Sequence, residues 1–166
     1  MKSAILVVAA LLGGCASAPK SEMERVALKV VADPKPTCEP AHEGALAGGA
    51  LTILPGETIC VSLKVQGDSV VPDAVVSSIS PESTLVVRLW QEPGSGATFL
   101  TLHNPLATYL GYQAHLLRPG ASQREYTTSC PVLSRRVGIE QWPYQVREIT
   151  LSNFASLPVS NAMVCK

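Results

Sequence analysis

The stretch Thr84–His103 reads TLVVRLWQEPGSGATFLTLH and decides the fold class. Leu85, Val87 and Leu89 recur at every second position, which is the period of a half-buried β-strand. Residues 92–96, EPGSG, then combine proline with two glycines, as turns do. A second apolar run follows this turn. The stretch therefore predicts a β-hairpin with these three side chains on its inward face.

The same two-residue period recurs outside the hairpin. In the segment 58–65, TICVSLKV, the residues Ile59, Val61, Leu63 and Val65 fall on one face. Further strands are expected at 50–53, 110–117, 125–130, 147–153 and 162–165, and 24–32 (ERVALKVVA) is expected to be an edge strand or a short helix. Seven or eight short strands without a helical period predict an all-β, antiparallel β-sandwich.

Residues 99–117, FLTLHNPLATYLGYQAHLL, place an Asn-Pro turn between two expected strands. This stretch resembles the corresponding turn in immunoglobulin-like domains of bacterial envelope proteins. The resemblance implies that the sandwich is immunoglobulin-like.

The composition excludes several classes of function. Thirteen Lys and Arg residues balance thirteen Asp and Glu residues, so we expect no basic surface for nucleic acid. Aromatic residues make up 5% of the chain, too few for a base-stacking platform beside a core. Hydrophobic residues make up 46%, which excludes a disordered polyelectrolyte.

The N-terminus is typical of an export signal. Lys2 supplies a positive charge, and the nine-residue apolar run 4–12 leads to Gly13, Gly14 and Cys15. A transmembrane helix needs about 20 apolar residues, so this run is too short to span a bilayer.

Residues 12–15, LGGC, resemble the lipobox of bacterial lipoproteins. The resemblance implies that signal peptidase II cleaves before Cys15 and that several acyl chains anchor this cysteine stably in a membrane. In that family the next residue biases sorting, and Ala16 implies the outer membrane, with the protein facing the periplasm. An ordinary signal in which Cys15 is incidental is the alternative.

These features predict three parts of the chain. Residues 1–14 are the signal peptide, 15–44 the lipidated cysteine and its tether, and 45–166 the sandwich domain. The tether begins with small and polar residues, ASAPKS at 16–21, and DPKPT at 33–37 breaks regular structure.

The remaining cysteines are Cys38, Cys60, Cys130 and Cys165. An even number in an exported chain predicts two disulfides, for which three connectivities exist. Proximity along the chain favours Cys38–Cys60 and Cys130–Cys165. Because no C-x-x-C motif occurs, we do not expect a redox motif or a zinc ribbon.

Two histidines are candidates for chemistry. His103 and His115 are expected on adjacent strands joined by the turn at Asn104, where they could form half of a metal site or a proton shuttle. No third ligand lies near them in the sequence, so two polar residues on a hairpin are the preferred interpretation. The motifs G-x-S-x-G, S-x-x-K and H-E-x-x-H are absent. We expect no enzymatic activity and no cofactor, with a metal-dependent enzyme as an alternative.

A long connection is expected over 131–145, and long connections often carry function. Trp, Tyr and Arg dominate the binding energy of many interfaces. The connection and the residues after it contain all three types, at Arg135, Arg136, Trp142, Tyr144 and Arg147.

We expect these five residues to bind an envelope protein. Residues 101–166 carry six basic and three acidic side chains, so an acidic partner surface would speed the encounter. Two alternatives stay open: the aromatic pair could instead close the end of the sandwich as a lid, and the protein could be a cell-wall or glycan-binding module.

Overall fold

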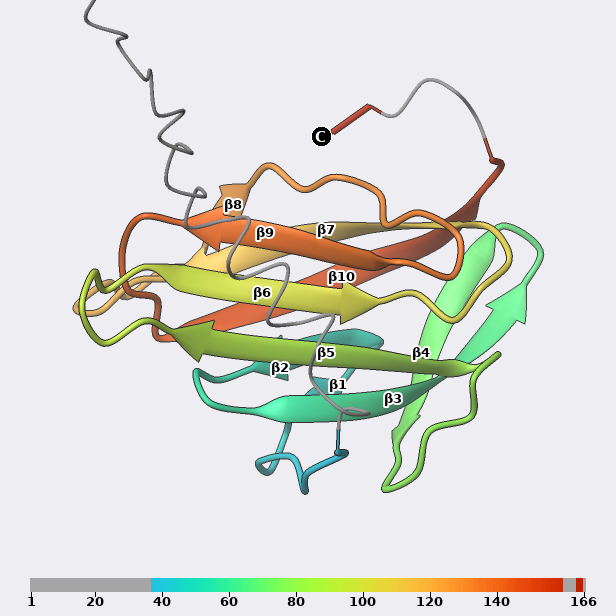
Figure 1. Cartoon of the computed structure of the whole chain (residues 1–166), viewed down its shortest axis with the longest axis horizontal. Coiled ribbons are helices and arrows are strands. Elements are labelled where there is room, and N and C mark those ends of the chain that lie inside the picture. Colours follow the sequence, from blue (N-terminus) through green and yellow to red (C-terminus); the bar gives the residue numbers. More distant parts are fainter. Residues whose placement is uncertain (1–36, 160–163, 166) are drawn as a thin grey trace, which may run out of the picture. The chain divides into compact units, whose positions relative to one another are not determined.

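The computed structural model describes residues 37–159 and 164–165, which contain ten β-strands and no helix (Figure 1). The strands are β1 (Leu46–Ala47), β2 (Ala50–Ile53), β3 (Thr58–Gln66), β4 (Ser69–Val75), β5 (Thr84–Gln91), β6 (Thr98–His103), β7 (Tyr109–Leu117), β8 (Glu125–Thr127), β9 (Val137–Trp142) and β10 (Glu148–Leu157). Within the described part of the chain, no helix is long and apolar enough to cross a membrane. The lipobox, the element at 24–32 and residues 15–36 of the expected tether lie outside the described residues. The last part of that tether, 37–44, is described and is fastened to the domain, because Cys38 bonds to Cys60.

The strands form two antiparallel layers. In Figure 1 the front layer has the order β4-β3-β5-β6-β9, and β1, β2, β10, β7 and β8 lie behind it. β10 links the layers, because it pairs with β2 and β7 and also with β4, through Ala155 and Ser69. The all-β, antiparallel sandwich expected from the sequence is confirmed, with ten strands instead of seven or eight.

The hairpin that decides the fold forms as expected from β5 and β6. Leu85, Val87 and Leu89 are fully buried. Val87 pairs with Ile59 of β3 on one side and with Leu102 of β6 on the other. Full burial of each such side chain contributes about 1.5–3 kcal/mol, so this row is a main source of stability.

The rear layer supplies the opposite wall of the core. Ile149 and Leu151 of β10 pair with Leu116 and Ala114 of β7, and all four side chains are buried. They belong to the same hydrophobic cluster as the apolar residues of the hairpin. One core therefore lies between the two layers.

Several local expectations are wrong. The strand β4 was not expected, because Pro72 and Asp73 interrupt its sequence; a register shift beside it, between Ser62 and Leu63, accommodates the proline. Val65 is 50% exposed instead of inward, because β3 runs beyond the core into its hairpin with β4.

The C-terminal half differs at four places. β8 ends at Thr127, before Cys130, and the connection expected over 131–145 contains the strand β9. β10 continues to Leu157, past the expected end at Asn153. Of the strand expected at 162–165, only residues 164–165 are described, and they are not in a strand.

Both expected disulfides form. Cys38 bonds to Cys60 and fastens the segment before β1 to β3. Cys130 bonds to Cys165 and fastens the C-terminal residues to the segment after β8. The connectivity expected from proximity along the chain is confirmed.

Candidate interaction surface

The five residues expected to form one docking loop lie at the two ends of a strand. Arg135 and Arg136 precede β9, whereas Trp142 is its last residue and Tyr144 and Arg147 follow it. Five steps of about 3.3 Å separate the first and last residues of β9, so the two groups are roughly 17 Å apart. The structure therefore does not bring the five residues together.

Trp142 is part of the hydrophobic core. Its side chain is 6% exposed, and its indole Nε1–H donates to Thr127 Oγ1 at 3.0 Å. A buried tryptophan whose polar atom is satisfied presents little surface to a partner. This placement supports the alternative that Trp142 closes the end of the sandwich.

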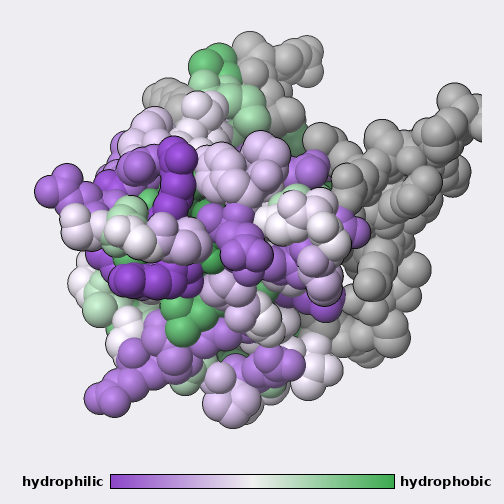
Figure 2. Space-filling view, turned by 90° about the vertical axis from the view of Figure 1, so that its left-hand side faces the viewer, coloured by the Kyte–Doolittle hydropathy of each residue, from purple (hydrophilic) through white to green (hydrophobic). Residues whose placement is uncertain are grey.

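Tyr144 is half-buried and packs against the same core. The guanidinium carbon of Arg118 lies 4.7 Å from the centre of its ring. Its carbonyl oxygen accepts a hydrogen bond from Thr98 Oγ1 at 2.7 Å. Figure 2 looks onto this end of the molecule, the left side of Figure 1, and shows a largely hydrophilic surface. The other end of β9 is therefore the better candidate for a docking site.

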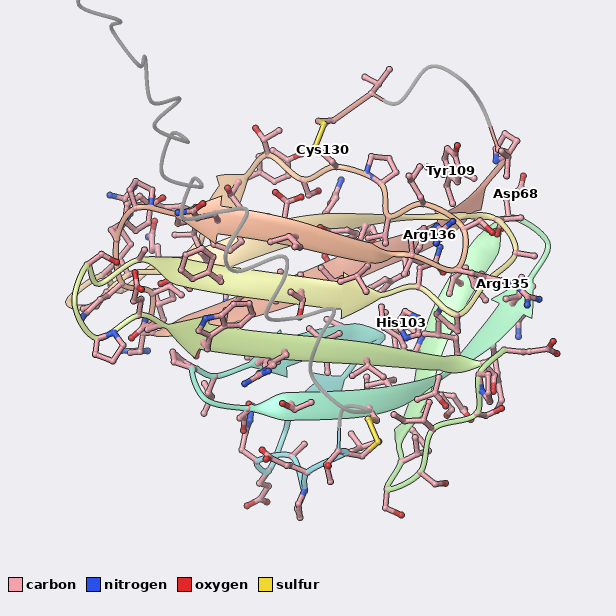
Figure 3. All side chains as sticks on the ribbon, in the orientation of Figure 1. Asp68, His103, Tyr109, Cys130, Arg135 and Arg136 are labelled. Atoms are coloured by element: carbon pink, nitrogen blue, oxygen red, sulfur yellow. A yellow bond between two sulfur atoms is a disulfide. The ribbon has the colours of Figure 1, made fainter. Side chains whose placement is uncertain are left out.

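The opposite end of β9 begins with an exposed turn, which we call the Arg135 turn and define by Leu133, Arg135, Arg136 and Val137. Leu133 and Val137 are 39% and 40% exposed, and both arginines are exposed. Figure 3 shows the two arginines at the same end of the molecule as His103, which pairs with Val137. The turn thus presents apolar surface beside two positive charges.

The backbone of the Arg135 turn is held from inside by Asn104, which is fully buried. The Asn104 side-chain amide donates to the carbonyl oxygens of Val132 at 3.1 Å and Leu133 at 3.0 Å, and its backbone N–H donates to Arg136 O at 3.0 Å. The backbone N–H of Arg135 donates to Leu106 O at 3.1 Å. These bonds fix the turn before any partner arrives, which lowers the entropy lost on binding.

Arg135 has a left-handed backbone conformation, with φ of 53°. A non-glycine residue in this region is uncommon and costs about 1–2 kcal/mol. Its guanidinium lies 3.6 Å from Glu82, but both side chains are largely exposed, so this ion pair is weak. Arg135 therefore occupies a strained backbone position while its charge stays accessible.

The histidine pair is not assembled, which corrects the expectation of adjacent strands. β6, with His103, pairs with β5 and β9, whereas β7, with His115, pairs with β10 and β8. The Asn104 turn crosses between the layers, and six steps along β7, about 20 Å, then separate Tyr109 from His115. Within the described ranges, no group of three His, Cys, Asp or Glu side chains could hold a metal ion.

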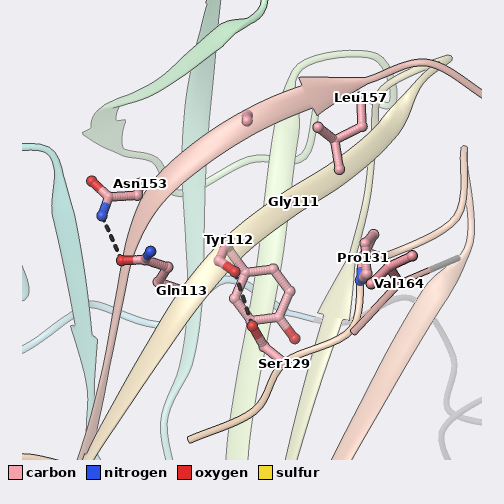
Figure 4. A pocket seen from close by; sticks show the side chains of 9 residues that line it. Gly111, Tyr112, Gln113, Ser129, Pro131, Asn153, Leu157 and Val164 are labelled. Carbon is pink, nitrogen blue, oxygen red and sulfur yellow. Dashed lines mark hydrogen bonds between the residues drawn. The ribbon is translucent and has the colours of Figure 1, made fainter. Parts of the chain in front are cut away.

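A hollow of about 160 Å³ lies along β7 and β10, between Gly111, Ser129, Asn153 and Leu157 (Figure 4). Its polar groups already bond to one another, as when Ser129 Oγ donates to Tyr112 O at 2.9 Å. Small-molecule sites usually measure about 300–1,000 Å³. The hollow is therefore too small, and its polar groups too fully bonded, to be the preferred candidate site.

Asn104, Leu133 and Val137 were not among the residues expected to form the site. Asn104 carried a signal, because an Asn-Pro pair between strands marks a turn whose amide can bond to backbone. Leu133 and Val137 carried none, since exposure of an apolar residue is a property of the folded chain.

Comparison with known proteins adds no relative, because no protein-family model, curated protein or solved structure matches this chain.

Proposed function

We propose that this chain is a non-enzymatic, lipid-anchored envelope protein that binds another protein through the Arg135 turn. The observation that carries the proposal is the rigid presentation of two arginines and two apolar side chains, with Asn104 holding the backbone behind them. Arginine is one of the residue types that most often dominate the binding energy of interfaces. The anchor at Cys15 and the position on the periplasmic face of the outer membrane follow from the resemblance of residues 12–15 to a lipobox.

The chemistry of the turn favours an acidic partner. Guanidinium groups bind carboxylates through paired, charge-assisted hydrogen bonds. A partner with carboxylates next to an apolar patch would match Arg135 and Arg136 together with Leu133 and Val137. Its charge would mainly accelerate encounter, while the apolar contact would slow dissociation.

Photo-cross-linking tests the partner site in cells that produce the full chain. With p-benzoylphenylalanine at Val137, we expect a discrete adduct with an envelope protein. Reversing both charges, Arg135→Glu with Arg136→Glu, should lower the yield at least about tenfold, which corresponds to roughly 1.4 kcal/mol. Arg147→Glu makes the same kind of change at the other end of β9 and serves as the matched comparison.

Two results would contradict the proposal: an adduct that tolerates the double reversal, or one that is lost equally with Arg147→Glu. A chain that gives no adduct but sediments with purified peptidoglycan sacculi would favour a glycan-binding module. Stoichiometric zinc or copper in the purified chain would favour the metal-dependent alternative.

The anchor has its own test. Cys15→Ala should abolish acylation and release the protein from membranes, because the acyl chains supply the attachment. Fractionation and mass spectrometry of the intact chain report both effects. A variant that still carries lipid and sediments with membranes would refute the anchor.

A further inference from the structure

The strand β9 has a partner on one side only among the described strands, and it borders the front layer in Figure 1. In an antiparallel ladder, opposite residues alternate between pairs that exchange hydrogen bonds and pairs that do not. The Asn104 N–H donates to Arg136 O, so these two residues form a bonded pair. The next pair, His103 with Val137, is therefore a non-bonded one.

The hydrogen bonds between β6 and β5, on the other side of β6, lead independently to the same alternation of bonded and non-bonded pairs. The backbone N–H of Glu92 donates to Ala97 O at 2.9 Å, which makes this a bonded pair of the β5–β6 ladder. Bonded pairs recur at every second residue from Ala97, so Phe99, Thr101 and His103 form their backbone hydrogen bonds with β5. The alternate residues of β6 are then the ones that bond toward β9.

It follows that Val137, Ile139 and Gln141 direct their N–H and C=O groups away from β6. Within residues 37–159 these six groups have no hydrogen-bond partner. The segment before β9 does not supply one, because its β-bridge joins Val132 to Leu110 of β7. Among the described residues, no strand pairs with this edge of β9.

The other edges of the described layers are protected. β1 has two residues, and β8 has three and carries Glu125. β4 contains Pro72 and Asp73 next to a register shift. Short strands, charges, prolines and bulges are the usual means by which proteins prevent unwanted pairing of edges. β9 has six residues, and the three residues that border its open edge are uncharged.

We propose that the open edge of β9 accepts an extended segment of the partner protein as an added strand, with acidic side chains beside Arg135 and Arg136. This inference rests on the proposed function, because it assigns the way in which the partner binds. Backbone hydrogen bonds to an added strand supply affinity, and the side chains at its ends supply specificity. The Arg135 turn lies at the start of β9, where carboxylates of such a segment would meet both guanidinium groups.

A second copy of this chain fits the edge less well. If two β9 strands paired antiparallel, Trp142 and Pro143 of one copy would lie against the Arg135 turn of the other. The arginines would then face no carboxylate. Charge complementarity therefore favours a different protein as the source of the strand.

A backbone substitution tests the added strand. Ile139→Pro removes an N–H that points away from β6 and leaves the β6–β9 hydrogen bonds in place, whereas Ile139→Ala changes the side chain alone. In the full chain with p-benzoylphenylalanine at Val137, we expect the proline variant to lose the adduct and the alanine variant to keep it. An adduct that persists in the proline variant would overturn the added strand.

Mapping the register gives a readout that does not depend on the stability of the proline variant. Cross-linkers at Val137 and at Gln141 should reach a single partner segment at sites about four residues apart, because paired strands advance together. Sites on unrelated segments, or an adduct of the chain with itself, would overturn the inference. No adduct at either position would contradict the proposed function itself, so the two failures are distinguishable.

Discussion

The side-chain amide of Asn104 donates a hydrogen bond to the carbonyl oxygen of Val132 at 3.1 Å, across 28 residues of chain. The same amide donates to Leu133 O at 3.0 Å and to Thr108 O at 2.8 Å, and its Oδ1 accepts from the Leu106 N–H at 2.9 Å. One buried side chain thus joins the turn between the layers to the turn before β9.

Replacing this side chain should destabilise the domain strongly. Asn104→Ala leaves buried backbone groups without partners, each at a cost of about 1–3 kcal/mol, so we expect a total loss of roughly 3 kcal/mol or more. Asn104→Asp should be worse at neutral pH, because it replaces the donor with an acceptor facing carbonyl oxygens. Urea unfolding measures both variants. A loss below about 1 kcal/mol for alanine would refute this role for Asn104.

Trp142 should behave as a core residue. Trp142→Ala empties its site and should cost about 3–5 kcal/mol. Thr127→Val keeps the indole in place but removes the acceptor of its N–H, so it should cost only about 1–3 kcal/mol. Denaturation midpoints compare the two. A Trp142→Ala chain of unchanged stability that no longer forms the cross-linked adduct would instead restore Trp142 as a docking residue.

Replacing Arg135 by glycine should reduce partner binding but change stability little. Arg135→Gly removes the strain of the positive φ but raises the conformational entropy of the unfolded chain. The two effects oppose each other, so the free energy of unfolding should change by no more than about 1 kcal/mol. Partner cross-linking should fall, because one guanidinium is lost. Asn153, with φ of 51°, provides the matched control. Asn153→Gly should leave cross-linking intact; if both variants lost it, the effect would be one of backbone conformation.

The two disulfides should stabilise the domain to similar degrees. They close loops with sequence separations of 22 and 35 residues. In the chain-entropy model such loops contribute about 3 and about 4 kcal/mol. We expect these losses when Cys38 and Cys60, or Cys130 and Cys165, are replaced by alanine in pairs. Urea unfolding measures them, and non-reducing peptide mapping of the unaltered chain provides the control: free thiols at all four positions would contradict both bonds.

Stability should fall at high pH because of Tyr112. Burial raises the pKa of Tyr112 far above its ordinary value. The Glu140 carboxylate, which accepts a hydrogen bond from the Tyr112 hydroxyl at 3.2 Å, raises this pKa further. A raised folded-state pKa gives stability that is complete below about pH 10, the ordinary tyrosine pKa, and is lost as the pH rises above it.

The free energy of unfolding of the natural chain should therefore decline above about pH 10, by up to roughly 1.4 kcal/mol per pH unit from this residue. Tyr112→Phe should show a shallower decline, since it has no phenol to ionise in the unfolded state. Urea unfolding at a series of pH values measures both. Parallel curves for the two proteins would refute this role for Tyr112.

Local patterns predict the parts of the fold that bury one face of a strand. Leu85, Val87 and Leu89 recur at every second position because their face of β5 packs on the core, and the same cause makes β3 and β7 recognisable. The disulfides were predictable from proximity, because chain segments close in sequence meet often in a sheet of short strands. These features are properties of short stretches of chain.

β9 was missed because its inward face is not apolar. Glu140 points inward, where its carboxylate accepts from the Tyr112 hydroxyl and from the Cys130 N–H, and Gly138 lies against Val132. Alternation of apolar residues is therefore absent from a strand that is well paired. Without β9, the sequence predicts Arg135 and Trp142 in one loop, whereas an extended strand holds them apart.

The path of the chain at Asn104 was equally hidden. An Asn-Pro turn between two strands is the same in sequence whether the strands pair with each other or lie in opposite layers. In the folded chain, Asn104 donates hydrogen bonds to the segment before β9, and these partners lie far along the chain. The prediction that His103 and His115 lie on adjacent strands is wrong for this reason.

The pairing of β10 with strands of both layers has a consequence for when the domain can form. Its Thr150 hydroxyl bonds to that of Thr52, 98 residues away, and its later residues reach β4. Neither layer is fully paired until β10 has taken its place. Pairings between residues so far apart in the sequence make folding slow. A domain whose layers both depend on residues 148–157 cannot complete its fold until these residues have been synthesised.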